Sequence, residues 1–261
     1  MIKAKKSLGQ NFLIDKKILE EITNIIPIKN KNILEIGPGT GNLTSYILNK
    51  NPKKLIVVEK DKYLASNLNN NFKNQIIIIN DDILKVDEKY LFEENAIVFG
   101  NLPYNISTEI LSKWILNLDN NFWFDHLILM FQKEVADRII SKFNNQNYSR
   151  ISILSSWRLE IKKVKEISPN SFYPKPKVKS CLLLLEPKKK FFNFKNPKNL
   201  EYITKIFFNQ RRKMINKPMS QLFKDINYVS KKLNINLNDR PQNLDPLTYF
   251  KLCKEYENKL N

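Results

Sequence analysis

The sequence predicts an α/β protein with a doubly wound, mainly parallel, Rossmann-like sheet and a small C-terminal helical domain. Between about residues 31 and 185, short β-branched runs alternate with amphipathic stretches, which is typical of strand–helix–strand units. After residue 185 only helical periodicity remains, interrupted by Pro and Asn. The length of 261 residues allows one large core and a small second domain.

The individual elements follow from these patterns. Asp15 is placed as the N-cap of a leading helix with Ile18, Ile22 and Ile26 on one face. Strands are predicted at residues 33–36, 55–59, 76–79, 96–100, 126–131 and 178–185. Helices are predicted between them at residues 42–48, 61–69, 108–118 and 133–143. The run Glu186-Pro-Lys-Lys-Lys-Phe191 predicts a linker, so the expected domains are residues 1–186 and 187–261.

The composition limits the classes of binding partner and the cellular location that we expect for this protein. The 44 Lys and Arg against 26 Asp and Glu give a formal charge of +18, which indicates a polyanionic partner, and we favour nucleic acid. The abundance of Asn, Lys and Ile is also typical of a genome with biased nucleotide composition, which raises the charge without a functional cause. No apolar run approaches the ~18 residues that cross a bilayer, and no signal segment follows the basic N-terminus. We therefore expect a cytoplasmic protein without a membrane partner.

Few residues are available for metal or nucleophile chemistry. Cys181 and Cys253 are too few for a disulfide framework or a thiolate cluster, which fits a reducing compartment. His126 is the only histidine, so a site with several histidines is excluded and a Ser-His-Asp triad could be built only around that residue. We predict no metal site.

A glycine-rich turn follows the first strand of the α/β region. In Leu34-Glu-Ile-Gly-Pro-Gly-Thr-Gly41, Gly37 and Gly39 let backbone N–H groups approach a ligand closely. The position that would complete the dinucleotide pattern G-x-G-x-x-G is Asn42, which disfavours a pyrophosphate ligand. The turn therefore predicts a small-molecule site, although tight packing alone also explains such glycines.

Two carboxylates end the next strands. Glu59 ends the second strand, where a carboxylate can accept hydrogen bonds from both ribose hydroxyls. Asp82 follows the third strand, where it can accept from an adenine amino group. Either carboxylate alone can be a solvated strand-end charge. Together with the glycine turn they lie at the sheet edge where open α/β sheets bind ligands, and they predict an adenosyl-containing cofactor.

The segment Phe99-Gly-Asn-Leu-Pro-Tyr-Asn-Ile-Ser-Thr108 resembles the N/D-P-P-Y signature of adenine amino-methyltransferases. An adenine amino nitrogen is a poor nucleophile because its lone pair is delocalised into the ring. The Asn101 side-chain oxygen and a backbone carbonyl near Leu102 can accept its two hydrogens and aim the lone pair at a methyl donor, while Pro103 stiffens that carbonyl. Tyr104 offers a stacking face for the base. A Pro-containing turn that closes a core strand explains Pro103 and Tyr104 but leaves Asn101 unexplained.

A second aromatic segment precedes the last strand. The prolines of Phe172-Tyr-Pro-Lys-Pro-Lys-Val-Lys-Ser180 exclude a helix and present Phe172 on a stiff loop. Phe172 can cover the other face of a base that has been withdrawn from its stack. A hydrophobic plug under the loop explains Phe172 equally well.

Taken in order, these motifs resemble the ribosomal RNA adenine dimethyltransferase family, and the resemblance covers nearly the whole chain. Its motifs here are Lys6-Ser-Leu-Gly-Gln-Asn-Phe-Leu13, Glu35–Gly41, Val58-Glu-Lys-Asp61, Gly100–Ser107, Gln132-Lys-Glu-Val135, Phe172-x-Pro-x-Pro-x-Val178, Phe208-Asn-Gln-Arg-Arg-Lys213 and Arg240-Pro-Gln-Asn-Leu244. The C-terminal motifs are similar to the branch that dimethylates two adjacent adenines near the 3′ end of small-subunit ribosomal RNA. They are less similar to the macrolide-resistance branch, which acts on large-subunit RNA.

The resemblance implies S-adenosyl-L-methionine as cofactor and small-subunit ribosomal RNA, within an immature subunit, as partner of a monomeric enzyme. Residues 1–186 would be the catalytic domain and residues 187–261 an RNA-binding domain. The implied cofactor contacts are Asn11, Leu13, Gly37, Gly39, Glu59, Asp82 and Asn101. Two departures from the family pattern, Ile83 after Asp82 and Tyr173 after Phe172, leave these assignments unchanged.

Basic side chains are the candidates for RNA contacts. They are Arg138, Arg150, Arg211, Arg212 and Lys213, the last three within Gln210–Lys213, which we expect on a helix. A solvated surface explains any one of them, and internal ion pairing can explain the cluster. Two other functions remain open: the resistance-type methyltransferase, and a ribosome-assembly or transcription factor that keeps the fold without methyl transfer.

Overall fold

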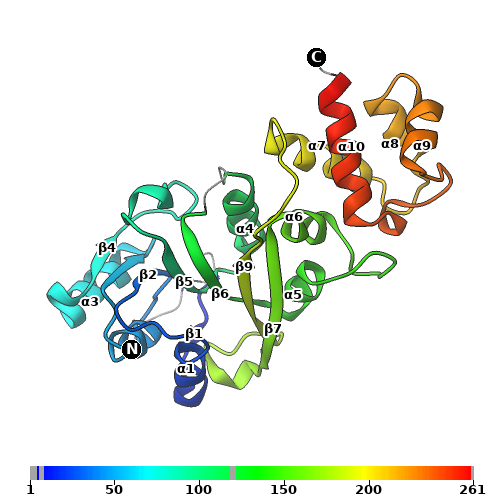
Figure 1. Ribbon diagram of the computed structural model, residues 1–261. Helices are drawn as coiled ribbons and strands as arrows, with labels where there is room; N and C mark the ends of the chain where they lie inside the picture. Colours follow the sequence, from blue (N-terminus) through cyan, green and yellow to red (C-terminus); the bar gives the residue numbers. More distant parts are fainter. Residues whose placement is uncertain (1–4, 6–8, 118–121, 260–261) are drawn as a thin grey trace. The chain divides into compact units, whose positions relative to one another are not determined.

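The computed structural model describes residue 5 and residues 9–117 and 122–259 (Figure 1). The first three residues of the first family motif, Lys6–Leu8, lie outside these described residues. The described residues belong to two compact units: Met1–Lys113 with Leu118–Ala136 and Ile161–Pro187, and Trp114–Asn117 with Asp137–Glu160 and Lys188–Asn261. A unit boundary lies at the predicted linker, whereas two segments expected in the first domain, residues 114–117 and 137–160, group with the second unit.

A seven-stranded sheet forms the centre of the first unit, as the fold class predicts. The strands lie in the order β4 (Ile77–Ile79), β3 (Lys54–Val58), β2 (Asn32–Ile36), β5 (Ala96–Asn101), β6 (Phe124–Gln132), β9 (Ser180–Pro187) and β7 (Leu159–Ile167). The strands from β4 to β6 are parallel, and β9 is antiparallel to β6. The chain moves outward from β2 to β4 and then returns to β5, so β2 and β5 flank the topological switch point where such sheets bind ligands.

Helices connect the parallel strands. The first unit contains α1 (Lys16–Thr23), α2 (Asn42–Leu48), α3 (Lys62–Phe72) and most of α4 (Ser107–Leu116), and α5 (Lys133–Ile139) follows β6. Asp15 caps α1 as predicted, because its carboxylate accepts hydrogen bonds from the backbone N–H groups of Lys17 and Ile18. A separate two-stranded pairing joins β1 (Phe12–Leu13) to β8 (Phe172–Tyr173).

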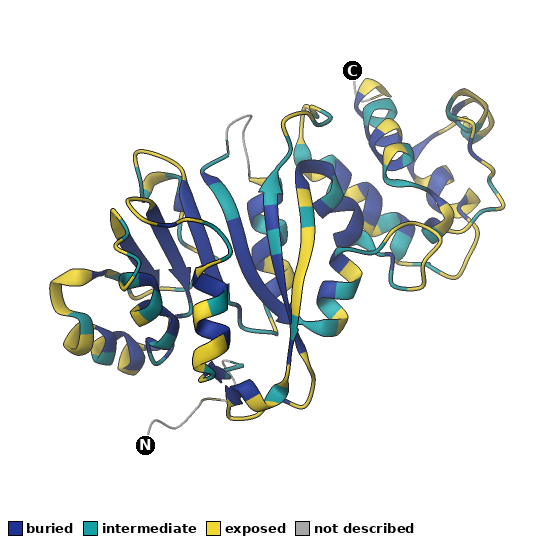
Figure 2. Cartoon of the chain, turned by 60° about the horizontal axis from the view of Figure 1, so that its bottom comes forward, coloured by how far each residue is buried: buried dark blue, intermediate teal, exposed yellow. Residues whose placement is uncertain are grey.

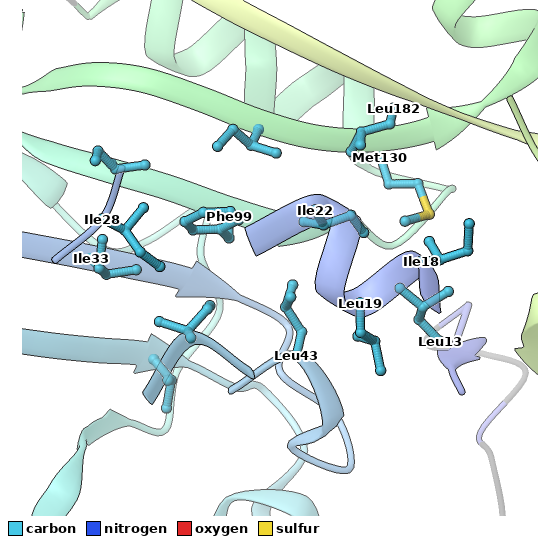
Figure 3. Close-up of a cluster of buried hydrophobic side chains, with 14 of the residues drawn as sticks. Leu13, Ile18, Leu19, Ile22, Ile28, Ile33, Leu43, Phe99, Met130 and Leu182 are labelled. Atoms are coloured by element: carbon cyan, nitrogen blue, oxygen red, sulfur yellow. The ribbon is translucent and has the colours of Figure 1, made fainter. Parts of the chain in front are cut away.

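The core of the first unit lies between α1, α2 and the sheet. Figure 3 shows Ile18, Leu19 and Ile22 of α1 near Phe99 of β5 and Met130 of β6. The central strands are almost wholly buried, whereas the edge strand β7 is exposed over much of its length (Figure 2). This packing fixes the carboxyl ends of the central strands, where the candidate site lies.

The second unit is helical. It contains α6 (Arg150–Arg158), α7 (Pro197–Phe208), α8 (Asn216–Leu222), α9 (Ile226–Leu233) and α10 (Pro246–Lys259). Its aromatic core includes Trp157, whose ring centroid lies 4.9 Å from that of Phe194, and Phe250, which lies 5.5 Å from Phe192. Across the part of the chain that the structure describes, no helix has the length and apolarity to cross a membrane.

Candidate active site

A pocket opens in the first unit at the carboxyl ends of β2, β3 and β5. Its open volume, which includes space continuous with solvent, is about 1180 Å³. Five segments supply most of its lining: the entry segment Gly9–Leu13, the glycine turn after β2, the end of β3, the residues that follow β4, and residues 101–106 at the end of β5. These include all the residues that the family resemblance assigned to the cofactor.

The glycine turn lies directly beside Glu59. Gly37 and Gly39 have φ angles of 63° and 59°, a region that glycine enters without steric cost. The Gly39 N–H donates to Glu59 Oε2 at 3.1 Å, and the Asp61 N–H donates to Glu59 Oε1 at 2.8 Å. Burial raises the pKa of Glu59 above its usual value, and these backbone hydrogen bonds oppose the rise. An ionised carboxylate has about four acceptor positions, so Glu59 keeps acceptor capacity for a ribose hydroxyl.

Asp82 lies at the pocket wall beyond β4. Its Oδ2 accepts from Lys60 Nζ at 2.7 Å, and its Oδ1 accepts from the Leu84 N–H at 3.0 Å. The hydrogen bond from Lys60 holds the pKa of Asp82 below its usual value, so the side chain is an ionised acceptor at neutral pH. Next to it, Ile83 is buried and lines the pocket, where its side chain can pack against a flat ring.

The entry segment is held in place by residues that the sequence analysis did not select. Asn42 Nδ2 donates to the Leu13 carbonyl at 2.7 Å, so the residue that breaks the dinucleotide pattern instead fixes this segment. Asp61 accepts from Lys5 Nζ at 2.8 Å and from Gln10 Nε2 at 3.3 Å. Burial alone would raise the pKa of Asp61, but these two hydrogen bonds, a third from the Tyr63 N–H and the charge of Lys5 together lower the pKa.

Asn101 lies at the end of β5, lines the pocket and contacts the entry segment. Its Nδ2 donates to the backbone carbonyl of Asn11 at 2.7 Å, which leaves Oδ1 as the acceptor for a ligand amine. Pro103 and Tyr104 follow in the same lining segment. The Tyr104 hydroxyl lies 2.6 Å from Ser180 Oγ, and this contact anchors the ring to β9. The structure thus brings three residues that the sequence analysis selected, Asn101, Pro103 and Tyr104, into one wall of the pocket.

Glu35 is a buried carboxyl group at the base of the same pocket. It lies on β2, is 1% exposed, and accepts a hydrogen bond from Thr44 Oγ1 at 2.7 Å. Burial raises the pKa of Glu35 to about 8; the Thr44 hydrogen bond opposes this rise, and the nearby charge of Glu59 adds to it. The group is therefore mainly protonated at neutral pH.

Phe172 does not lie in the pocket wall. It is 3% exposed, pairs with Leu13 between β8 and β1, and belongs to the core cluster. This burial agrees with the interpretation of Phe172 as a plug under the loop. Its role in covering the adenine stays a prediction, which requires the side chain to leave the core when RNA binds.

The five basic candidates for RNA contacts all fall in the second unit. The cluster Gln210–Lys213 lies in a turn after α7, because the helix ends at Phe208, and not on a helix as expected. Arg211 donates to the carbonyl of Gln146 and, at 3.3 Å, to Gln242 Oε1, while Arg150 lies 3.5 Å from Glu201. Arg138, Arg212 and Lys213 are exposed. The structure thus gives Arg150 and Arg211 partners within the protein.

Comparison with known proteins identifies the family. A family model described as "Ribosomal RNA adenine dimethylase" matches residues 1–258. The chain belongs to the ribosomal RNA adenine dimethylase family. A curated relative from Pelagibacter ubique (strain HTCC1062), named "Ribosomal RNA small subunit methyltransferase A", is 65% identical over 256 residues and 98% of each chain. A relative of the same name from a Wolbachia of Drosophila simulans is 39% identical over 94% of this chain and 90% of its own.

Solved structures agree with this assignment. A dimethyladenosine transferase from Plasmodium falciparum has a TM-score of 0.80 and 28% identity, over 95% of this dimethylase and 98% of its own chain. The 23S rRNA methyltransferase ErmE shares the fold, with a TM-score of 0.67 at 20% identity over 95% of this chain and 99% of its own. This dimethylase is accordingly an enzyme that methylates ribosomal RNA with S-adenosylmethionine as cofactor.

The pocket of the dimethylase fits that cofactor. A Cβ on Gly39 would lie 2.7 Å from Phe12 Cδ1, so the glycine turn and the entry segment are in close contact. In this pocket Glu59 would accept from ribose hydroxyls, Asp82 from an adenine amino group and Asn101 from the amine to be methylated. When bound, S-adenosylmethionine supplies an electrophilic sulfonium methyl group. The residues of this pocket would bind and orient the reactants, and none of those described above is placed as a strong general base.

Proposed function

We propose that this dimethylase methylates the exocyclic amino groups of two adjacent adenines near the 3′ end of small-subunit ribosomal RNA, to the dimethyl form, as part of small-subunit biogenesis. The substrate is the RNA within an immature subunit, and the enzyme acts as a monomer in the cytoplasm. The 65% identity to a relative named for the small subunit supports this choice of subunit.

The observation that carries the proposed chemistry is the fixed Asn101 amide. Its Nδ2 is engaged by the Asn11 carbonyl, so Oδ1 can accept a hydrogen from an adenine amine, and the carbonyl near Leu102 can accept the second. With both hydrogens held, the nitrogen lone pair points out of the ring plane and along the direction of attack. The rate then arises from orientation and preorganised polar contacts.

Aromatic packing supports a flipped base. Tyr104 lies in the pocket wall and is anchored by Ser180, so its ring is held in place before RNA binds. Stacking of one base on an aromatic side chain contributes roughly 1–3 kcal/mol. That amount offsets much of the few kcal/mol needed to withdraw a base from its stack.

The test uses purified small subunits that lack adenine dimethylation, in immature and mature forms, with large subunits as the comparison. The enzyme and methyl-labelled S-adenosylmethionine are added, and nucleosides from each RNA are analysed by mass spectrometry. We expect dimethyladenosine in the small-subunit RNA, with immature particles as the better substrate. Label only in large-subunit RNA would establish the resistance-type activity instead, and a protein that binds cofactor and subunits without transfer would be an assembly factor.

A further inference from the structure

One lysine of helix α4 holds the loop that follows β4. Lys113 Nζ donates hydrogen bonds to the backbone carbonyl of Ile83, at 2.8 Å, and to that of Val86. It also pairs with the carboxylate of Glu88, whose Oε1 and Oε2 lie 2.8 Å and 3.0 Å from the ammonium nitrogen. The side chains of Lys113 and Glu88 are 17% and 4% exposed, so these contacts form largely away from solvent. All four residues belong to the first unit.

The loop itself has little regular structure to fix its position. It comprises residues 80–88, and we call it the Asp82 loop. Before the short 3₁₀ helix Glu88–Tyr90, its backbone forms neither a strand nor a helix. The Lys85 N–H donates to the Asp82 carbonyl at 2.8 Å and closes one turn. A loop of this kind depends on side-chain donors for its backbone carbonyls, and Lys113 supplies them at two positions.

The Asp82 loop forms the pocket wall that is expected to hold the cofactor adenine. Asp82 and Ile83 both line the pocket, and the carbonyl bound by Lys113 belongs to Ile83 itself. A shift of the Ile83 backbone would therefore carry the neighbouring carboxylate with it. Lys60 also contacts Asp82, but the Lys60 side chain is 55% exposed, and ion pairs at the surface contribute little. The backbone of the loop thus sets the position of the Asp82 carboxylate.

The same helix is joined to the reacting motif. Helix α4 begins at Ser107, directly after the lining segment 101–106, and Ser107 Oγ donates to the Tyr104 carbonyl at 3.3 Å. The Ile110 side chain is fully buried and anchors the helix. Lys113, one turn further along, reaches the Asp82 loop. Because binding groups must be held to within about 0.5 Å to act together, an attachment of both pocket walls to one helix has a functional consequence.

We propose that Lys113 is a positioning residue that holds the Asp82 loop so that Asp82 accepts from the adenine amino group of S-adenosylmethionine. Among the described residues, Lys113 is not part of the pocket lining, so it acts through the loop. An ion pair that served stability alone would need only Glu88, whereas the two carbonyl contacts tie the ammonium group to the backbone that carries Asp82. The proposal concerns the cofactor and holds whichever RNA is methylated.

The test measures how strongly the pocket recognises the adenine amino group. Calorimetry gives the dissociation constants of S-adenosylhomocysteine and of S-inosylhomocysteine, in which a carbonyl oxygen replaces the amino group. Glu88→Gln breaks the ion pair but leaves the ammonium group on both carbonyls. Lys113→Met in the Glu88→Gln background also removes the ammonium group, and the pair then leaves no buried charge behind. Urea unfolding of each variant reports on its fold.

Wild type and Glu88→Gln should both prefer the adenosyl ligand at least ~10-fold, because hydrogen bonds to a charged group are the stronger kind. The double variant should bind S-adenosylhomocysteine about 10-fold more weakly, with S-inosylhomocysteine affinity nearly unchanged, so that the preference falls to about threefold or less. If the double variant does not fold, Lys113→Gln in the same background replaces it with the same expectation. Its amide is one atom shorter and has two donors instead of three.

Three results would overturn the proposal. Equal weakening of both ligands in the double variant, with the preference kept, would make Lys113 a purely structural residue. An equal loss of preference in Glu88→Gln would assign the effect to the ion pair and not to the carbonyl contacts. A wild type without any preference would remove the role of Asp82 that Lys113 is proposed to support. The assay contains no RNA, so the proposed function is judged separately, by methyl transfer to small subunits.

Discussion

The raised pKa of Glu35 predicts how the free energy of unfolding depends on pH. The pKa of this carboxyl group is about 8 in the folded protein, mainly because burial penalises its charged form, and 4.5 is its usual value. Between these two pH values the folded protein binds a proton that the unfolded chain has released. Stability is therefore fully present below pH 4.5 and is lost as pH rises towards 8.

The size of the effect follows from the two pKa values. One pKa unit corresponds to 1.36 kcal/mol, so the difference between 4.5 and about 8 amounts to about 5 kcal/mol over the whole window. Between pH 5.5 and 7.5 the loss is about 2.7 kcal/mol. Glu35→Gln keeps a neutral side chain of the same shape that can still accept from Thr44, and it should abolish this part of the pH dependence.

The assay is urea unfolding followed by circular dichroism at several pH values from 5 to 8. The wild type should lose about 2–3 kcal/mol more than Glu35→Gln between pH 5.5 and 7.5. Glu20→Gln is the control, because Glu20 is exposed and its hydrogen bond with Lys50 lowers its pKa, so it does not titrate in this window. Identical pH dependence in the wild type and Glu35→Gln would show that Glu35 is ionised in the folded protein and would refute the reasoning.

Three further predictions concern ligand binding. Glu59→Ala should weaken S-adenosylmethionine binding at least ~10-fold with the fold intact, since hydrogen bonds to a charged group contribute about 1.5–3 kcal/mol; unchanged affinity by calorimetry would remove the ribose assignment. Gly39→Ala should also weaken cofactor binding, because its Cβ would meet Phe12 and its φ of 59° strains a residue with a side chain by about 1–2 kcal/mol; equal calorimetric affinity would argue against a close-fitting cradle. Arg211→Ala with Arg212→Ala should flatten the salt dependence of RNA affinity by about 0.7–0.9 per lost phosphate contact, and an unchanged slope would leave this charge without a role in binding.

Much of the fold could be predicted because the central strands are continuous apolar runs. The helix expected at residues 42–48 is α2, and all six expected strands agree with the structure to within two residues at each end. The edge strand β7 was missed because its exposed lysines replace the apolar alternation that signals a strand. Likewise, α6 was missed, and the C-terminal helix α7 ends before its arginine cluster.

The candidate-site residues that could be predicted from the sequence are those that lie at the ends of strands. Glu59 and Asn101 lie at the carboxyl ends of parallel strands, and these ends lie at one edge of the sheet irrespective of the conformation of the loops. Asp61 and Asn42 were not selected because their roles depend on contacts with the entry segment, which is distant in sequence. The position of Phe172 could not be predicted, because the sequence does not indicate whether an aromatic side chain in a proline-rich loop faces a ligand or is buried in the core, where Phe172 lies.

The most direct test of the account is single-turnover methyl transfer by Asn101 variants. Wild type, Asn101→Ala and Asn101→Asp are compared on unmethylated small subunits and on subunits that contain synthetic monomethyladenosine, with saturating cofactor. Asn101→Ala should transfer methyl groups at least ~10²-fold more slowly with a modest loss of cofactor affinity, the scale for removing one preorganised polar contact. Asn101→Asp should retain more activity because a carboxylate still offers an acceptor oxygen, and the wild type should convert monomethyladenosine to the dimethyl form. Transfer of both methyl groups by Asn101→Ala at the wild-type rate would contradict the role of this side chain and with it the proposed chemistry.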